Sequence, residues 1–436
     1  MMKIPNFTIL FIIGVFLLGL FAIVIYEHFK YSPFALSVDF GVIKEYIFDR
    51  HVECYNPVFR NKFYNTLWNS KERFNTYEFA ISISSILSTF QDGITRIEIP
   101  NRKVDKILSL EFKYIDNVVV VSRVRKVLEP KDSFNESLLG AEIVSINGIP
   151  MEKILEKYSL LYPNLSTYES RYAFVEKLLP YFLKIIGASS VKIDYKLPNS
   201  STILSTYVKG FQKSELEESG NDKIIDIFTL GETVCLRVYS FNISKKEEMA
   251  YVSEELEKIA YQSNENTKFI VDLRYAKDGD ETLITALLSY LISEPKYLYP
   301  KLYVRYRDKL ILKEQMPLIS SERKIRGKVY FIVDKTCFYQ PHKILFGFLS
   351  ENPVAKIIST DREFNIPKMF YTDEFWRILP NTRSYIVFPT SKVVLNMLPK
   401  IVVSEGLKLS ESEVYDSNKY EKYVTEKLIG YIGMID

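Results

Sequence analysis

Histidine, cysteine and glycine are all scarce in this chain of 436 residues. Glycine fills 16 positions, roughly half of its usual share of about 7%. Few residues are therefore available for a metal site with several His or Cys ligands, or for a glycine-rich phosphate-binding loop. The histidines and cysteines are His28, His51, His342, Cys54, Cys235 and Cys337. An odd number of widely spaced cysteines also excludes a disulfide scaffold.

A strong excess of charge of one sign is absent as well. The 57 Lys and Arg residues against 54 Asp and Glu residues leave a formal charge of +3, whereas domains built to grip nucleic acid carry a clear basic excess. Hydrophobic residues at 47% and charged residues at 25% are typical of globular proteins and exclude wholesale disorder. The length indicates about two or three domains.

One long apolar run stands near the N-terminus. Residues 7–26 form 20 uncharged positions, and a helix of that length spans roughly 30 Å, the thickness of the hydrocarbon core of a bilayer. We predict a signal anchor over residues 1–30, since the run is longer than the apolar core of a signal peptide and no small-residue cleavage site follows it. A cleaved signal peptide is the alternative. Lys3 favours a cytoplasmic N-terminus, which places the bulk of the chain outside the cytoplasm at the cell membrane.

The remaining sequence changes character twice. Residues 31–99 show apolar spacing of three and four, as in Val42, Ile43, Tyr46 and Ile47, which predicts a helical N-terminal region. Residues 100–230 carry strand-like runs and tight turns, which predicts a β-rich domain with a helical insertion. From 231 to 436, short apolar strands alternate with helical runs, a pattern typical of an α/β layer.

Tight-turn and strand signals mark particular positions in these regions. Asp116-Asn117 before the β-branched run 118–121 and Asn147-Gly148 between apolar residues both predict hairpin turns. Strands are expected over 190–197, 234–238, 268–273, 328–333, 355–358, 384–388 and 392–395, and helices over 281–292, 342–349 and 419–432. The polar stretch 213–223 is the expected linker.

Several segments, in one order, resemble a known family. Leu138–Leu155 is similar to the Ile-x-Ser-Ile-Asn-Gly core of a PDZ-like domain. Thr267–Leu291 resembles the Asp-Leu-Arg-x-Asn-x-Gly-Gly strand, turn and helix of the tail-specific, or C-terminal-processing, serine peptidases, and Lys328–Leu349 resembles their nucleophile strand and helix. Ser88–Ile99 resembles the Asp-Gly-His-Thr turn of the tricorn-like branch, and Arg377–Thr382 a late Leu-Pro-Asn-Ser segment. The resemblance implies a PDZ-like domain followed by a ClpP/crotonase-like α/β core.

The catalytic positions that this resemblance implies carry the wrong residues. The nucleophile position holds Tyr339, which is bulky and has an ordinary pKa near 10. The lysine base of one branch falls at Asn365, and the histidine of the other falls at Ile94. The oxyanion turn reads Asp278-Gly279, with a carboxylate where negative charge develops. Four independent departures indicate a degenerate catalytic site.

Two catalytic alternatives remain open from the residues. Cys337 and His342 stand five positions apart, and a Cys–His pair is able to cleave an acyl bond. A serine peptidase with an atypical arrangement is the other, for which the nearest serines are Ser320, Ser321 and Ser359.

A peptide groove without catalysis is the function that the resemblance favours. In the family the PDZ-like module receives a peptide C-terminus, and a strand-addition groove with an apolar pocket is a common way to do so. The residues we expect at such a groove are Leu139, Gly140, Ile143, Ile146, Cys337 and Phe338. For Ile143 and Ile146, a role in the core is the simpler interpretation. Neither a cofactor, nor a metal, nor nucleic acid is expected. A protein that uses the fold only as a spacer is a further alternative.

Overall fold

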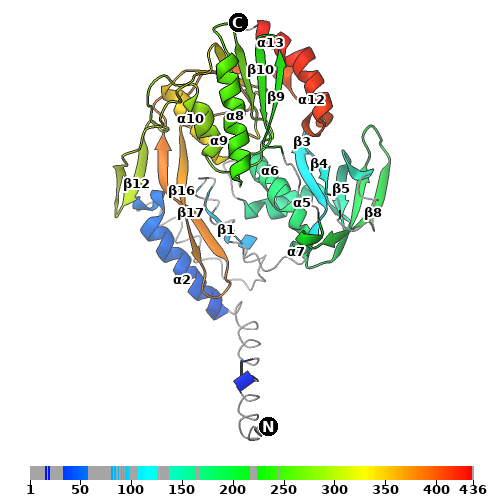
Figure 1. The fold of residues 1–436 in the computed structure, drawn as a ribbon. Helices are drawn as coiled ribbons and strands as arrows, with labels where there is room; N and C mark the ends of the chain where they lie inside the picture. The colour runs from blue at the N-terminus through cyan, green and yellow to red at the C-terminus, as the bar shows by residue number, and fades with distance from the viewer. Residues whose placement is uncertain are drawn as a thin grey trace, which may run out of the picture.

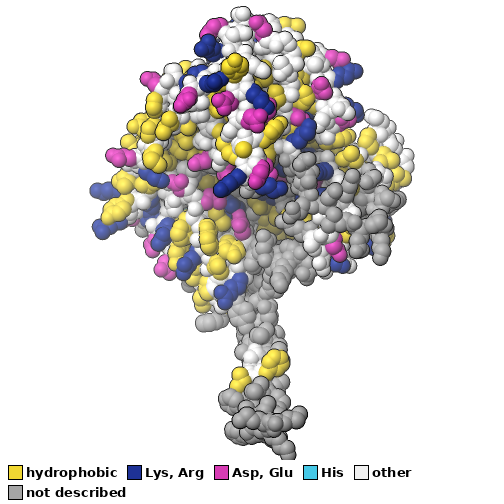
Figure 2. Space-filling view, in the orientation of Figure 1, with side chains coloured by type: hydrophobic (Ala, Val, Ile, Leu, Met, Phe, Trp, Pro, Cys, Tyr) yellow, Lys and Arg dark blue, Asp and Glu magenta, His cyan; other side chains and the backbone are white. Residues whose placement is uncertain are grey.

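The structure is a computed structural model that describes most of the chain after residue 32. The described residues are 15, 16, 18, 19, 33–56, some positions between 80 and 98, 106–125, 127, 137–162, 167–216, 223–243 and 245–434. Figure 1 shows two lobes joined side by side, with the C-terminus at one end of the molecule and helix α2 (Pro33–Arg50) at the other. Figure 2 shows basic and acidic side chains interspersed over this face, in keeping with a formal charge of +3.

A six-stranded sheet forms the centre of the C-terminal half. Its order is β18-β15-β14-β11-β10-β9, with neighbouring strands parallel except for the antiparallel pair of β9 and β10. The strands are β9 (Ile225–Leu230), β10 (Thr233–Val238), β11 (Lys268–Asp272), β14 (Lys328–Val333), β15 (Lys356–Ser359) and β18 (Ile401–Val403). Helices α8 (Lys246–Gln262), α9 (Thr282–Ser289) and α10 (Gln340–Glu351) lie in the crossovers. The expected α/β core is therefore present.

Helices cover both faces of this sheet, so its strands read as continuous apolar runs. In β11, Phe269 and Val271 pack into the cluster formed with α8, α9 and α10, whereas Ile270 packs on the opposite face. That opposite face is covered by the C-terminal segment, made of α11 (Glu411–Tyr415), α12 (Ser417–Tyr423), a π turn (Val424–Leu428) and α13 (Ile429–Met434). The terminal helix expected over 419–432 is thus present but divided.

Residues 106–216 hold a seven-stranded antiparallel sheet of order β2-β8-β7-β5-β4-β3, with β6 beside β5, and we call them the PDZ-like unit after the expectation from sequence. Its strands are β2 (Ile107–Leu108), β3 (Leu110–Ile115), β4 (Val118–Val124), β5 (Glu142–Ile146), β6 (Ile149–Pro150), β7 (Ser190–Lys196) and β8 (Ile203–Phe211). Helices α5 (Met151–Tyr158), α6 (Thr167–Lys177) and α7 (Phe182–Ile186) form the expected insertion. Both predicted hairpin turns are confirmed, since Asp116, Asn117, Asn147 and Gly148 all have positive φ.

A third sheet joins the N-terminal region to the core. Its strands are β1 (Arg96–Glu98), β12 (Leu302–Tyr306), β13 (Lys309–Leu312), β16 (Met369–Ile378) and β17 (Tyr385–Val394). Helix α2 packs Ile43 and Ile47 against Ile386 and Phe388 of β17. The N-terminal region therefore shares its core with the C-terminal half and is not an independent unit.

Three expectations differ from the structure. The strands predicted over 384–388 and 392–395 are one continuous strand, β17. The residues between them remain extended because they also pair with β16. The boundary expected at 230/231 lies before Ile225, since β9 pairs with β10 along its whole length. Helix α8 was not predicted.

The membrane anchor predicted over residues 7–26 lies almost wholly outside the described residues. Within the described part of the chain, no helix is long and apolar enough to cross a membrane. The anchor stays a prediction.

Candidate functional site

Tyr339 lies at the N-cap of helix α10, directly after the turn that follows strand β14. Its φ and ψ of −67° and 165° are extended, and Pro341 at the start of the helix fixes the next turn. The side chain does not cap the helix. This strand-to-helix turn is where the resemblance to serine peptidases places a nucleophile.

The Tyr339 ring leaves its own unit and packs into the hydrophobic cluster of the PDZ-like unit. Its hydroxyl donates a hydrogen bond of 3.3 Å to a carboxylate oxygen of Glu176 on α6. The Lys177 ammonium lies 5.0 Å from the ring centroid, and Phe338 packs at 4.4 Å between centroids. Only 5% of Tyr339 is exposed, and burial together with Glu176 raises its pKa well above the ordinary value. A phenol held protonated in this way is a poor nucleophile.

A small cavity of about 80 Å³ remains beside Tyr339. It is lined by four positions that the sequence analysis assigned to a candidate catalytic or peptide-binding site, namely Ile94, Asp278, Phe338 and Tyr339. Its other lining residues are Arg96, Tyr162, Ala173, Lys177, Gln340, Lys343 and Glu374. The cavity is far below the roughly 300–1,000 Å³ of ordinary ligand sites.

Hydrogen bonds to Asp92 hold the turn in which the resemblance expects a histidine base, and this position is occupied by Ile94. Asp92 accepts hydrogen bonds of 2.7 Å from the backbone N–H groups of both Ile94 and Thr95, and its other oxygen lies 2.9 Å from His51 Nε2. Burial alone raises the pKa of Asp92, but hydrogen bonds with His51 and Thr95 bring it below the ordinary value. Because His51 Nδ1 accepts from the Glu53 N–H, its Nε2 donates to Asp92, which is a structural role. The apolar Ile94 side chain accepts no proton.

The turn that the resemblance assigns to the oxyanion region contains an ion pair. Asp278 contacts Lys177 of α6 in a close ion pair and also accepts from the Gly279 N–H at 2.9 Å. Gly279 is required by close packing, since a Cβ there would lie 2.1 Å from the backbone carbon of Phe241. The negative charge that the sequence placed in this turn is therefore neutralised by a lysine of the PDZ-like unit.

The remaining catalytic alternatives are not assembled into a site. Asn365 is exposed in the loop after β15 and does not line the small cavity. Cys337 is buried, its thiol lies 3.5 Å from the Leu273 carbonyl, and burial raises its pKa well above the ordinary value. His342 is fully buried, and among the described residues neither of its ring nitrogens has a hydrogen-bond partner, Cys337 included.

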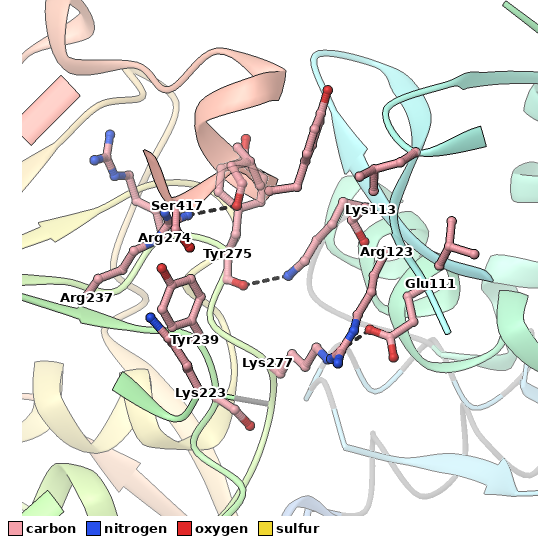
Figure 3. A pocket seen from close by; sticks show the side chains of 16 residues that line it. Glu111, Lys113, Arg123, Lys223, Arg237, Tyr239, Arg274, Tyr275, Lys277 and Ser417 are labelled. Carbon is pink, nitrogen blue, oxygen red and sulfur yellow. Dashed lines mark hydrogen bonds and ion pairs between the residues drawn. The ribbon is translucent and has the colours of Figure 1, made fainter. Parts of the chain in front are cut away.

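A second cavity, of about 720 Å³, lies between the PDZ-like unit and the core. Figure 3 shows Lys113, Arg123 and Glu111 on one wall, facing Lys223, Arg237 and Lys277 on the other. The rest of the lining is Ser122, Val124, Leu139, Tyr239, Ser240, Arg274, Tyr275, Val414, Tyr415 and Ser417. Six of the lining side chains are basic and one is acidic. Four of the basic groups face a carboxylate, since Lys113 lies near Glu176, Lys223 near Asp226, Arg274 near Asp272 and Lys277 near Glu111.

The walls of the large cavity are held by specific contacts. The Lys113 ammonium donates to the Tyr275 carbonyl at 2.6 Å and to the Tyr172 hydroxyl at 3.1 Å. Tyr275 has a φ of 59°, a conformation that is uncommon for a bulky residue. Arg237 donates to the Val414 carbonyl at 2.9 Å and stacks 3.7 Å from the Tyr420 ring centroid. These contacts fix the basic groups in place before any ligand arrives.

The charges in this cavity influence one another. Burial raises the pKa of Glu111, but Lys277 and Arg125 outweigh it and lower the pKa to about 2. Burial lowers the pKa of Lys113, and the nearby Lys277 and Arg237 act in the same direction. The six basic groups outnumber the four carboxylates that face them, and an excess of one sign of charge in a cleft concentrates counter-ions.

The groove residues expected from sequence fall into different places. Leu139 is 47% exposed and lines the large cavity. Gly140 has a φ of 79°, and a Cβ there would meet the Tyr415 hydroxyl at 2.4 Å, so the glycine lets this wall close. Ile143, Ile146 and Cys337 are buried in hydrophobic clusters. Phe338 lines the small cavity instead.

Sequence reasoning missed the partners of Tyr339. Glu176 and Lys177 stand 163 and 162 positions earlier in the chain, and no motif marks them. Lys343 was missed too, although it follows Tyr339 by one helical turn, a spacing that the sequence displays. Burial lowers the pKa of Lys343, and its ammonium forms no ion pair with the described residues. No group of His, Cys, Asp and Glu among the described residues has the arrangement of a metal site.

Comparisons with known proteins support the fold. No family model and no curated protein matches the sequence. Among solved structures, mature CPAF complexed with lactacystin is 12% identical, with 91% of this chain and 98% of that chain covered and a TM-score of 0.58. Mature CPAF by itself is 11% identical, with 91% and 97% covered and a TM-score of 0.57. The photosystem II D1 C-terminal processing protease is 12% identical, with 87% and 97% covered and a TM-score of 0.47. The two matches to mature CPAF show that the chain has the same mixed α/β fold as that structure.

Proposed function

We propose that this protein is a membrane-anchored, extracytoplasmic pseudopeptidase that binds polypeptide chains and does not cut them. The observation that carries the proposal is Tyr339, which fills the nucleophile position with a buried phenol bonded to Glu176. Ile94 supplies no base beside it, and the space left is about 80 Å³. A scissile peptide bond does not fit against a nucleophile in that space.

The polypeptide ligand is assigned to the large cavity. Leu139 lines it beside the basic side chains of Arg123 and Lys223, which we take as the donors for a chain terminus. Its volume of about 720 Å³ suits a segment of a few residues. The anchor is supported by the 20 uncharged positions of residues 7–26, and by the exposure of Val15, Phe16 and Leu18 within that run.

A fluorophosphonate probe tests the loss of catalysis. The full chain should remain unlabelled under conditions that label an active serine peptidase to stoichiometry. Ile94→His with Tyr339→Ser returns both family residues to the small cavity and serves as the matched comparison. Stoichiometric labelling of the unmodified chain that a single serine substitution abolishes would overturn the proposal.

An active serine peptidase is the alternative, and one contact favours testing it. Lys324 donates a hydrogen bond to Ser320, a Ser–Lys pair at a spacing of four residues. Neither residue lines the two cavities described above. Ser359 is buried, and its hydroxyl donates to the Asp361 carbonyl at 2.8 Å. Ser320→Ala and Ser359→Ala are therefore the substitutions to combine with the probe.

Fluorescence anisotropy with labelled decapeptides tests binding. Peptides with a free C-terminal carboxylate should bind at least about tenfold more tightly than the same peptides as C-terminal amides, a difference of about 1.4 kcal/mol. Arg123→Gln with Lys223→Gln should remove most of that preference and weaken its salt dependence. Lys258→Gln, an exposed position on α8, is the matched control. Equal binding of acid and amide would place the ligand elsewhere, and no binding would favour the spacer interpretation.

A further inference from the structure

The turn of the β16–β17 hairpin is fastened to the first turns of helix α2. The Asn381 and Thr382 backbone N–H groups donate to the two carboxylate oxygens of Asp39 at 2.9 and 2.8 Å. The Asn381 side-chain amide donates to the Ala35 carbonyl at 3.0 Å. Asp39 is fully buried by these contacts. The hairpin tip, defined as residues 376–383, therefore keeps a fixed place beside the N-terminal end of α2.

The sequence places that end of α2 close to the apolar run. Six residues separate position 26 from Pro33, and the seven steps from 26 to 33 span at most about 25 Å when the chain is extended. If residues 7–26 cross a bilayer, the first turn of α2 lies within that distance of its surface. Figure 1 shows α2 and the end of the β16–β17 hairpin at one extremity of the molecule, opposite the C-terminus.

The hairpin tip has the composition of a membrane-interface segment. Trp376 is 61% exposed and Ile378 is 40% exposed, although both stand on a well-paired strand. Arg377 and Arg383 are exposed on the same tip, and residues 376–383 contain no acidic side chain. Tryptophan is enriched at the boundary between headgroups and acyl chains, and arginine forms charge-assisted hydrogen bonds with phosphate groups.

We propose that the hairpin tip rests in the headgroup layer of the membrane in which the chain is anchored. Trp376 and Ile378 contact the boundary of the acyl chains, and Arg377 and Arg383 contact lipid phosphates. The proposal rests on the anchor in the proposed function, and it adds a second attachment. A single attachment would leave the folded part free to tilt, whereas two attachments at one end of the molecule fix its orientation relative to the bilayer.

Because the chain has only two tryptophans, fluorescence can measure the contact of the hairpin tip with the membrane. The chain contains two, Trp68 and Trp376, so Trp68→Phe leaves Trp376 as a single fluorescent reporter. The full chain carrying this change is reconstituted in vesicles of phosphatidylcholine and phosphatidylglycerol with a doxyl quencher near the headgroup. We expect a blue-shifted Trp376 emission and at least about twofold quenching, because an interfacial side chain lies roughly 5–10 Å into the boundary. The matched control is Trp68→Phe/Trp376→Phe/Tyr261→Trp, which moves the reporter to an exposed site on α8.

Two further measurements distinguish failure of the anchor from failure of the hairpin contact. Flotation of the vesicles reports the anchor separately: a chain that does not float overturns the anchor and this proposal with it. A chain that floats with Trp376 unquenched overturns the hairpin contact alone. In the unmodified chain, hydrogen exchange of residues 376–383 should slow in vesicles relative to detergent. Arg377→Gln with Arg383→Gln should reduce the quenching in anionic vesicles, whereas Arg307→Gln with Arg323→Gln should not, and equal effects of the two pairs would also contradict the proposal.

Discussion

The Tyr339 hydroxyl donates a hydrogen bond to the Glu176 carboxylate across the contact between the core and the PDZ-like unit. This contact joins the start of α10 to α6, two helices that lie in different units of the fold. In a peptidase of this fold the same place would have to admit a substrate. Here it is packed, so the position that would serve catalysis holds the two units together.

Tyr339→Ala should destabilise the protein strongly. Removing a buried aromatic ring leaves a cavity, and such substitutions cost about 3–5 kcal/mol. Tyr339→Phe keeps the ring and removes only the hydroxyl, so it should cost about 1.5–3 kcal/mol, the range for a hydrogen bond to a charged group. Urea unfolding followed by circular dichroism measures both. Equal costs for the two variants would show that packing contributes little at this position.

Gly140→Ala should be more costly than Gly148→Ala. Both glycines have a φ above 70°, so both substitutions carry a similar backbone strain of about 1 kcal/mol. Only at Gly140 does the new Cβ meet another group, the Tyr415 hydroxyl at 2.4 Å, whereas nothing lies within 4 Å of it at Gly148. The difference between the two midpoints of thermal unfolding therefore reports the Tyr415 contact. Tyr415→Leu should relieve Gly140→Ala and leave Gly148→Ala unchanged.

His342 should make the protein less stable in acid. Burial lowers its pKa from 6.5 to about 4, and of the charges that face it Asp278 opposes the shift while Lys343 supports it. A group with a lowered folded pKa contributes stability above the unfolded pKa and loses it as the pH falls through the folded value. We therefore expect about 3 kcal/mol to be lost between pH 6.5 and pH 4.

Urea unfolding over that pH window measures the contribution of His342. In His342→Phe the slope of stability against pH should become shallower, and His28→Gln, which keeps His342, should retain the original slope. An unchanged slope in His342→Phe would assign the acid sensitivity to other groups.

Breaking the Asp272–Arg274 pair should destabilise the fold far more than breaking a surface pair. Arg274 donates to both oxygens of Asp272 at 2.8 and 2.5 Å, and both side chains are buried. Arg274→Met leaves Asp272 charged and buried, which costs about 3–5 kcal/mol. Lys223→Met breaks the exposed pair with Asp226 and should cost at most about 1 kcal/mol. Comparable free energies of unfolding for the two variants would contradict the buried role.

Local patterns were enough to predict much of the fold. Strand β14 was expected over 328–333 and occupies those residues, because a β-branched and aromatic run between helices has no other stable place than a covered sheet. The Asn147-Gly148 turn was expected because few residues adopt positive φ without strain. Helix α8 carried a signal that was overlooked, since Val252, Leu256 and Ile259 follow the helical spacing and are buried.

The order of the motifs, through the resemblance to a known family, predicted from sequence alone that Tyr339, Ile94 and Asp278 stand at catalytic positions. Only the tertiary structure decided what these side chains contact. Glu176 and Lys177 reach Tyr339 and Asp278 from a helix more than 100 positions away, and no local pattern encodes such a meeting. The same holds for the basic cavity, whose walls come from both units. Periodicity acts between neighbours in sequence, whereas charge pairing and cavity shape depend on which surfaces the fold brings together.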